Sequence, residues 1–141
     1  MTNKVFDILR QRYVELTPEE QVRQRFVHFL IEELGYSATL MANEVQLTLN
    51  GMSRRCDTVV YDRQLHPRMI IEYKRSDVQI TQKVFDQISR YNIVMRVEYL
   101  VVSNGIEHYC CRLDYDSLSY TFLKNIPPFE ELVDSSFTSS T

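Results

Sequence analysis

Two carboxylates and an ammonium group, Asp57, Glu72 and Lys74, lie within one short stretch of the sequence. The segment from Asp62 to Pro67 separates the first two and has the composition of a turn. If a four-residue loop joins the strands at its two ends, Asp57 lies directly opposite Glu72. Opposed residues project to one face of a sheet, with Cβ atoms about 5 Å apart. Lys74 shares that face with Glu72, because side chains alternate along a strand.

Such a cluster is suited to binding a divalent cation. Like charges that oppose one another destabilise a sheet, and carboxylate oxygens are good ligands for Mg²⁺ or Mn²⁺. The side chain of Tyr73 points away, but its backbone carbonyl could be a further ligand. Lys74 could then orient an attacking water or stabilise the charge that develops on a phosphate. The pattern predicts a metal site at Asp57, Glu72 and Tyr73, which a one-residue slip in register would abolish.

The alternative is that Glu72 and Lys74 are ordinary solvated strand residues, because Glu-x-Lys triplets are common. Two features favour a site instead. The apolar run 69–71 leads directly into Glu72, so the carboxylate ends a buried strand. The helix expected next places Gln87 and Tyr91 four residues apart, hence on one face. Tyr91 also belongs to the apolar stripe of that helix and could be a core residue.

The elements that position these residues are indicated by capping and periodicity. Thr17, Pro18 and Glu20 form a capping-box helix start, and Gly35 is a natural end. Residues 4–16 are expected to form an earlier helical piece. Further along are a strand at 45–49, the Asn50-Gly51 hairpin turn, strands at 55–61 and 68–74, a helix capped by Thr81, and strands at 99–102, 107–113 and 120–122.

This order of elements predicts the fold class. A helix, a three-strand meander, a second helix and further strands indicate an α/β fold with a central mixed sheet flanked by helices, since the second helix favours a parallel crossover. With 141 residues, 44% of them hydrophobic, the chain fits a single domain over 1–134. The Ser/Thr-rich segment 135–141 is expected to be a disordered tail.

Composition excludes several classes. No apolar run is long enough to span a membrane, and no signal peptide precedes the first charges, which favours the cytoplasm. The three cysteines and three histidines show no zinc or disulfide spacing. The net charge of −3 argues against a generic nucleic-acid coat protein. The segment 54–96, however, carries nine Lys or Arg and five Asp or Glu, so a local basic surface could meet phosphates.

Several motifs together resemble a known family. Asp57, then Ile70-Ile71-Glu72-Tyr73-Lys74 and Gln87-Ile88-Ser89-Arg90-Tyr91, resemble the PD-(D/E)xK nucleases that carry a Q-x-x-x-Y element. More narrowly, the chain resembles the N-terminal domain of type I restriction enzyme R subunits, especially its small stand-alone relatives. The stretches that carry this likeness are 17–24, 55–57, 80–87 and 103–105, and it covers roughly residues 15 to 125. It implies a restriction-endonuclease-like core.

The resemblance also implies roles. In that family the Asp and Glu bind magnesium and the Lys assists water attack, and they match Asp57, Glu72 and Lys74. The Gln and Tyr that sit near the substrate match Gln87 and Tyr91. The expected function is that of a magnesium- or manganese-dependent endonuclease acting on DNA.

An acidic residue on the first helix often completes the metal site in that family, and Glu20 is the closest match, although the capping box also explains it. The chain has no G-x-x-x-x-G-K-[ST] loop, so cleavage would proceed without translocation or with machinery from a partner protein. The competing hypothesis is a nucleic-acid- or protein-binding module without turnover. A small-molecule hydrolase is disfavoured, because no nucleophile elbow or metal-histidine cluster is present. Oligomeric state and substrate preference are not indicated.

Overall fold

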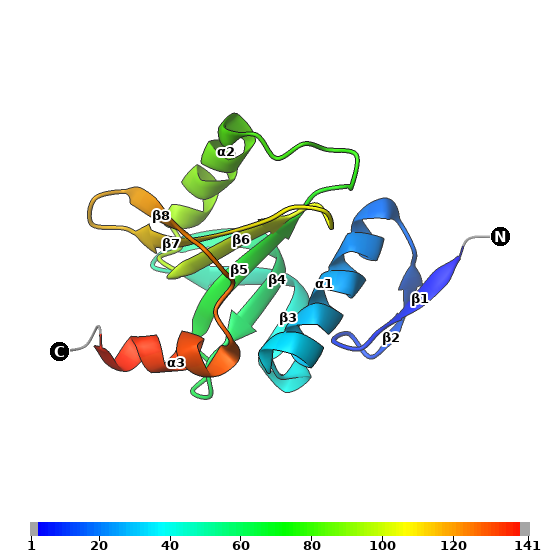
Figure 1. Cartoon of the computed structure of the whole chain (residues 1–141). Helices are drawn as coiled ribbons and strands as arrows, with labels where there is room; N and C mark the ends of the chain where they lie inside the picture. Colours follow the sequence, from blue (N-terminus) through cyan, green and yellow to red (C-terminus); the bar gives the residue numbers. More distant parts are fainter. Residues whose placement is uncertain (1–2, 139–141) are drawn as a thin grey trace.

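The computed structural model describes residues 3–138, and Figure 1 shows the arrangement of their helices and strands. The chain begins with a small hairpin, continues through a long helix into a large sheet, and ends in a third helix. The elements are β1 (Lys4–Asp7), β2 (Arg12–Glu15), α1 (Pro18–Leu34), the 3₁₀ turn η1 (Ala38–Leu40), β3 (Met41–Leu49), β4 (Met52–Tyr61), β5 (Pro67–Tyr73), α2 (Gln82–Ile93), β6 (Tyr99–Ser103), β7 (His108–Asp114), β8 (Ser119–Leu123) and α3 (Phe129–Thr138).

The main sheet has six strands in the order β3-β4-β5-β6-β7-β8. Neighbours pair antiparallel except β5 and β6, which are parallel. Helix α2 supplies the crossover that a parallel pair needs. The predicted α/β fold, with a mixed sheet and a helix between its third and fourth strands, is therefore confirmed.

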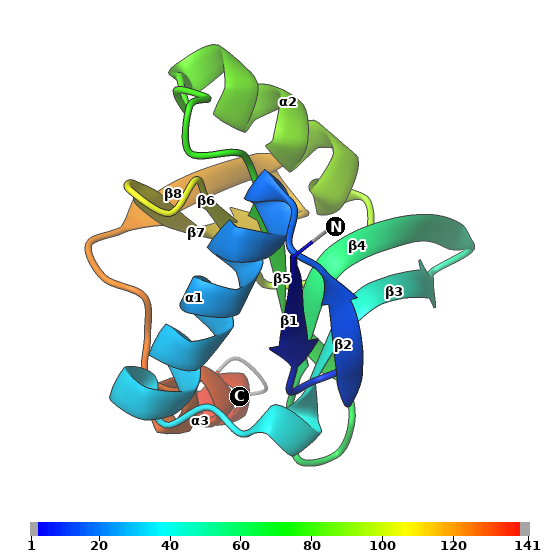
Figure 2. The same cartoon turned by 90° about the vertical axis from the view of Figure 1, so that its right-hand side faces the viewer.

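Helices cover both faces of this sheet, so there are two cores. Residues of α1 and α3, among them Phe26, Leu30 and Leu132, pack on one face. Phe85 and Ile88 of α2 pack on the other face. Figures 1 and 2 show α1 and α2 separated by the strands. Strands buried on both faces account for the continuous apolar runs at 69–71 and 99–102.

The helix starts follow the predicted caps, with one difference. The Thr81 hydroxyl accepts the Val84 N–H at the start of α2, and the Thr17 hydroxyl accepts the Glu20 N–H at the start of α1. Gly35 ends α1 with φ of 75°. The reciprocal half of the capping box is absent, because the Thr17 N–H donates to the Glu15 carbonyl. The Glu20 carboxylate instead accepts hydrogen bonds from the side chains of Arg10, Arg23 and Gln24.

The expectation of a helical piece at 4–16 was wrong, because this segment forms the antiparallel hairpin β1–β2. The centre of each strand consists of two β-formers, Val5 and Phe6 in β1 and Tyr13 and Val14 in β2, which favours pairing over a helix. Phe6 pairs with Tyr13 across the hairpin, and their ring centroids lie 5.3 Å apart. In the connecting turn the Asp7 carboxylate accepts the Leu9 N–H.

At the other end, α3 continues to Thr138, so the boundary expected at residue 134 falls inside a helix. The rest of the expected tail, 139–141, lies outside the described residues. Among the helices of residues 3–138, none is both long and apolar enough to cross a lipid bilayer.

Candidate active site

From Val60 towards Asp57, the register of the β4–β5 hairpin is the predicted one, although the turn is not: Tyr61, rather than Asp62, pairs with Pro67. Thr58 pairs with Ile71, so the next opposed residues along the two strands are Asp57 and Glu72. The pairing becomes irregular only towards the turn, between Val60 and Tyr61. The predicted juxtaposition of the two carboxylates is confirmed.

A cleft of about 530 Å³ contains this pair together with Tyr73 and Lys74. Four acidic and four basic side chains line it, so its charge is balanced overall. The lining residues are Glu19, Arg23, Glu44, Arg54, Asp57, Glu72, Tyr73, Lys74, Arg75, Val78 and Ile88. The structure thus brings together the four residues expected at the metal and the attacking water.

Backbone contacts hold these residues at the end of β5. Asp57 Oδ2 accepts the Tyr73 N–H at 2.9 Å, which ties β4 to β5 beside the site. The Tyr73 phenol donates to the Thr58 hydroxyl at 2.9 Å and is buried in the core on the α1 side, so its side chain points away as expected. The Lys74 N–H donates to the Ser103 carbonyl at 2.8 Å, which extends the β5–β6 pairing by one residue.

The electrostatics of Glu72 fit a cation site. Its side chain is buried, and burial, followed by the negative charge of Asp57 and a hydrogen bond with it, raises the pKa of Glu72 well above its usual range. The ion pair with Arg54 opposes this rise. A divalent cation between the carboxylates would relieve their repulsion, so the donor set has the chemistry that such an ion needs.

Among the described residues, no group of three or more His, Cys, Asp or Glu side chains could hold a metal. The protein could therefore offer two carboxylates, Asp57 and Glu72, with the Tyr73 carbonyl nearby. Mg²⁺ usually keeps several waters and takes one or two carboxylates together with substrate phosphates. A two-carboxylate site suits Mg²⁺ or Mn²⁺ better than a cation that requires a full protein cage.

Arg54 belongs to this site, although no sequence motif indicates it. Its Nη2 donates to Glu72 Oε1 at 2.7 Å, and its Nε donates to Asn92 Oδ1 at 3.2 Å. The guanidinium lies 5.4 Å from the ring centroid of Tyr91. Strand alternation alone places Arg54 on the opposite side of β4 from Asp57, so no local signal indicates this contact.

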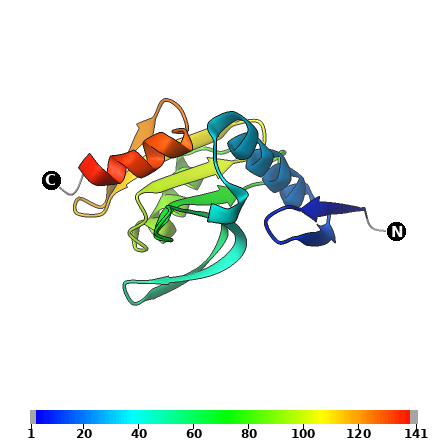
Figure 3. The ribbon, with the colours of Figure 1, turned by 90° about the horizontal axis from the view of Figure 1, so that it is seen from below.

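Arg54 lies on the same side of the sheet as Glu72 because the β3–β4 hairpin is irregular at Glu44. Beyond this residue, the side chains that would face α1 in a regular strand face α2 instead. Glu44 has φ of 56°, a left-handed conformation that is rare for a residue other than glycine. Before it, Asn43 points to the α1 side, where its amide donates to Asp7. After it, Val45 packs against the core on the α2 side. Figures 2 and 3 show the hairpin curling away from the rest of the sheet.

The Glu44 side chain lines the cleft and is held by two arginines. It forms ion pairs with Arg23 and with Arg55, the latter at 3.0 Å. Burial favours a higher pKa for Glu44, but the bonds to Arg23 and Arg55 outweigh it and lower the pKa. Arg23 also lies 5.6 Å from the ring centroid of Tyr73. No sequence motif indicates Glu44 or Arg23, because their positions depend on contacts between α1 and β3.

Glu20 does not line the cleft, whereas the preceding residue, Glu19, does. The buried Glu20 carboxylate accepts hydrogen bonds from Arg10 at 2.6 Å, from Arg23 at 3.2 Å and from Gln24 at 2.9 Å. The role expected for Glu20 at the metal stays a prediction, and it would require Glu20 to leave these partners.

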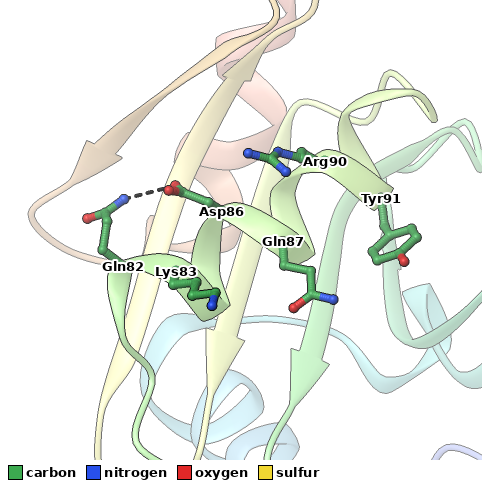
Figure 4. Close-up of a pocket in the computed structure, with 6 residues that line it drawn as sticks. All are labelled: Gln82, Lys83, Asp86, Gln87, Arg90 and Tyr91. Carbon is green, nitrogen blue, oxygen red and sulfur yellow. Dashed lines mark hydrogen bonds between the residues drawn. The ribbon is translucent and has the colours of Figure 1, made fainter.

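Gln87 and Tyr91 also lie outside this cleft. They line a neighbouring hollow of about 830 Å³ on the outer face of α2, with Gln82, Lys83, Asp86 and Arg90. Figure 4 shows the six side chains projecting from one helix. Tyr91 is 58% exposed, so it is not a core residue. Its contact with Arg54 links the hollow to the cleft.

Comparisons with known proteins agree with this architecture. Residues 18–127 match the family model described as type I restriction enzyme R protein N terminus (HSDR_N). A fragment of a protein described as an HsdR subunit of a type I restriction enzyme from Vibrio vulnificus YJ016 has a similar fold, with a TM-score of 0.57 and 18% sequence identity. The match covers 84% of this chain and 25% of that one. No curated protein matches the chain.

Proposed function

Because this chain belongs to the family of type I restriction enzyme R protein N termini, we propose that it is a metal-dependent phosphodiesterase of the endonuclease type that acts on DNA. The observation that carries the proposal is the position of Asp57 opposite Glu72, with Lys74 in the same cleft. The arrangement follows the PD-(D/E)xK pattern that the sequence resembles.

The chemistry follows from these residues. Asp57, Glu72 and the Tyr73 carbonyl would hold Mg²⁺ or Mn²⁺, which when bound polarises a phosphoryl oxygen and makes a coordinated water more acidic. Lys74 would orient the attacking water or stabilise the negative charge that develops on the phosphate. Gln87 and Tyr91, on the outer face of α2, would contact the nucleic acid beside the scissile bond.

A DNA substrate is supported by the cations around the cleft. Arg23, Arg54, Lys74 and Arg75 line it, and Lys83 and Arg90 line the adjoining hollow on α2. Lys and Arg side chains bind phosphates of the backbone. This chain spans about a quarter of the solved HsdR fragment. As a further part of this proposal, a partner protein supplies translocation or sequence specificity.

The test is cleavage of supercoiled plasmid DNA by the purified chain with Mg²⁺ or Mn²⁺, compared with Lys74→Ala. Wild type should nick the plasmid only with metal, and Lys74→Ala should lower the rate by orders of magnitude, because Lys74 acts on the transition state. Metal affinity and binding of uncleaved DNA should change little. If wild type cleaves no supercoiled, linear or single-stranded DNA with either metal, the nuclease proposal for the isolated chain is abandoned.

One observation favours a second candidate, a nucleic-acid- or protein-binding module that keeps the fold without turnover. Arg54 forms an ion pair with Glu72, so part of the charge of the carboxylate pair is compensated without a metal ion. In that case neither wild type nor Lys74→Ala would show metal-dependent cleavage.

A further inference from the structure

Arg54 lines the cleft and contacts Glu72, but it has no specific role in the proposed chemistry at the metal. Its side chain is 27% exposed and the Glu72 side chain is 9% exposed, so their ion pair is largely shielded from water. The Arg54 guanidinium bonds to β5 through Glu72 and to α2 through Asn92, and it lies near the Tyr91 ring. The Arg54 guanidinium is thus held beside Glu72, an expected metal ligand, by contacts with β5 and α2.

The anchor on α2 is rigid. Asn92 is fully buried, and its amide donates to the Ile88 carbonyl at 2.8 Å, one turn earlier in the helix. Its Oδ1 is therefore oriented towards Arg54. Because the bond to Asn92 uses Nε and the bond to Glu72 uses Nη2, the guanidinium can leave Glu72 and keep its contact with α2.

Arg54 lies beside Glu72 because of the irregularity at Glu44 in the β3–β4 hairpin. Cys56 and Val59 of β4 pack in one core cluster although they are three residues apart, so the facing of the strand changes between them. Glu44, which adopts the left-handed conformation, lies on the neighbouring strand β3 beside this part of β4. A regular β4 would direct Arg54 and Asp57 to opposite faces of the sheet.

A guanidinium and a divalent cation cannot share Glu72 without cost. Two positive charges a few ångströms apart repel one another, most strongly where water is partly excluded. A guanidinium, on the other hand, binds phosphate oxygens through two parallel hydrogen bonds. Arg54 thus has one anionic partner inside the protein and a second kind, a phosphodiester, that the cleft could admit.

We propose that Arg54 is a positioning residue with two partners: it pairs with Glu72 until a divalent cation displaces it, and it then binds a phosphate of the DNA. The inference rests on the proposed function, because it needs both the metal and the nucleic acid. It makes two predictions of opposite sign: loss of the Arg54 charge should strengthen metal binding and weaken DNA binding.

The first experiment measures Mn²⁺ binding by calorimetry without DNA, at alkaline pH, where protons compete least with the metal for carboxylates. Arg54→Ala should bind Mn²⁺ about tenfold more tightly than wild type, because a charged competitor is gone. Arg54→Gln, which keeps donors for Glu72 and Asn92 but not the charge, should behave in the same way and guards against misfolding of the alanine variant. Arg63→Ala is the matched control: Arg63 follows the opposite end of β4, pairs with Glu130 and has a side chain that is 56% exposed, so its loss should not change Mn²⁺ affinity.

The second experiment measures binding of a fluorescent duplex oligonucleotide in Ca²⁺ by anisotropy. Arg54→Ala and Arg54→Gln should each weaken binding by about tenfold, the loss expected for one charged contact to a phosphate. Unchanged DNA affinity in both variants would overturn the phosphate-binding half of the inference.

The outcomes separate this inference from the proposed function. If Asp57→Asn abolishes Mn²⁺ binding while both Arg54 variants bind as wild type does, the metal site stands and the Arg54 inference is overturned. If Mn²⁺ binds only when Arg54 is replaced, the competition is confirmed. If neither wild type nor any Arg54 variant binds Mn²⁺, the metal site and the Arg54 inference fail together.

Discussion

Asp57 and Glu72 differ in what compensates their charges. Asp57 accepts a backbone N–H from Tyr73, whereas Glu72 is more deeply buried and depends on Arg54. Because burial and the charge of Asp57 both disfavour ionisation of Glu72, the pair stores repulsion that a cation would relieve. Replacing either carboxylate should therefore remove metal binding without unfolding the protein.

Asp57→Asn tests this. With Mn²⁺ or Mg²⁺ at about a hundredfold over its Kd, the wild-type protein should gain about 2.7 kcal/mol of stability by mass action. Asp57→Asn should show no metal-dependent rise in melting temperature, although its side-chain oxygen can still accept the Tyr73 N–H. In the absence of metal the variant should melt no lower than wild type. Asp116→Asn, at an exposed position, should respond to metal as wild type does. An equal rise in both variants would place the metal elsewhere.

Glu44 carries a conformational cost at the same site. A left-handed backbone costs an L-residue roughly 1–2 kcal/mol, and asparagine tolerates it better than a β-branched residue does. Glu44→Asn should therefore be more stable than Glu44→Val by about 1–2 kcal/mol in urea unfolding. At Gln46, an exposed residue two positions along β3, the order should reverse, because valine is the better strand former. The same order at both positions would contradict a strained Glu44.

At the scale of elements, the β1–β2 hairpin is tied to the site through buried polar contacts. Asp7 is fully buried, bonds to Arg10 and accepts the Asn43 amide. Arg10 in turn bonds to Glu20 of α1. The Thr58 hydroxyl, which donates to Asn43 Oδ1 at 2.6 Å, continues this chain towards Tyr73. The hairpin lies outside the residues that match the family model, 18–127.

This network predicts a pH dependence of stability. Burial opposes ionisation of Asp7, but its bonds to Asn43, Arg10 and the Leu9 N–H prevail and lower its pKa below 3.8. The stabilisation is therefore present above that value and is lost as the pH falls through the lower, folded-state pKa. Asp7→Asn should cost about 1–3 kcal/mol at neutral pH.

The cost of Asp7→Asn should shrink as the pH falls through the lowered pKa of Asp7, because the wild type then becomes protonated there. Urea unfolding of both proteins at neutral pH and at a series of decreasing acid pH values provides the check. Asp77→Asn, which affects an exposed ion pair with Arg75, is the control and should change stability by less than about 1 kcal/mol at any of these pH values. A deficit of Asp7→Asn that persists unchanged in acid would show that its charge is not what stabilises the hairpin.

At the scale of the whole molecule, the net charge of −3 does not describe the surface around the cleft. Arg54, Lys74 and Arg75 line the cleft, and Lys83 and Arg90 lie on the adjoining face of α2. An acidic protein can still bind DNA through such a face, because affinity depends on the phosphates contacted locally. We expect this face, and no other, to carry the salt dependence of binding.

Arg90→Ala should therefore weaken DNA binding and reduce the slope of log K against log salt concentration by about 1. Titrations of a duplex oligonucleotide in Ca²⁺ at several salt concentrations measure both quantities. Arg63→Ala is the control: Arg63 follows the opposite end of β4 and pairs with Glu130 of α3, so its loss should leave the slope unchanged. A larger effect of Arg63→Ala than of Arg90→Ala would move the DNA to another face.

Local sequence was sufficient for the central hairpin and the helix starts. Turn residues at 62–67 locate the β4–β5 hairpin, and strand alternation brings Glu72 and Lys74 to the face of Asp57, although no local pattern indicated the irregularity between Val60 and Tyr61. The caps at Thr17 and Thr81 involve residues three apart, so they too follow from nearby positions. Each of these features depends on contacts within one turn or one hairpin, which a sequence pattern describes directly.

Tertiary structure decided the rest, because the deciding contacts join segments far apart in the chain. The segment 4–16 forms a hairpin whose Asp7 accepts hydrogen bonds from the distant Asn43, a contact that no local pattern indicates. The Glu20 carboxylate forms ion pairs with Arg10 and Arg23 instead of completing the capping box. Arg54 reached Glu72 because the change of facing near Glu44 turned the outer half of β4 towards α2. A sequence pattern predicts which residues alternate along a strand. Only packing against other elements determines where that alternation is interrupted, so that a different set of side chains faces α2.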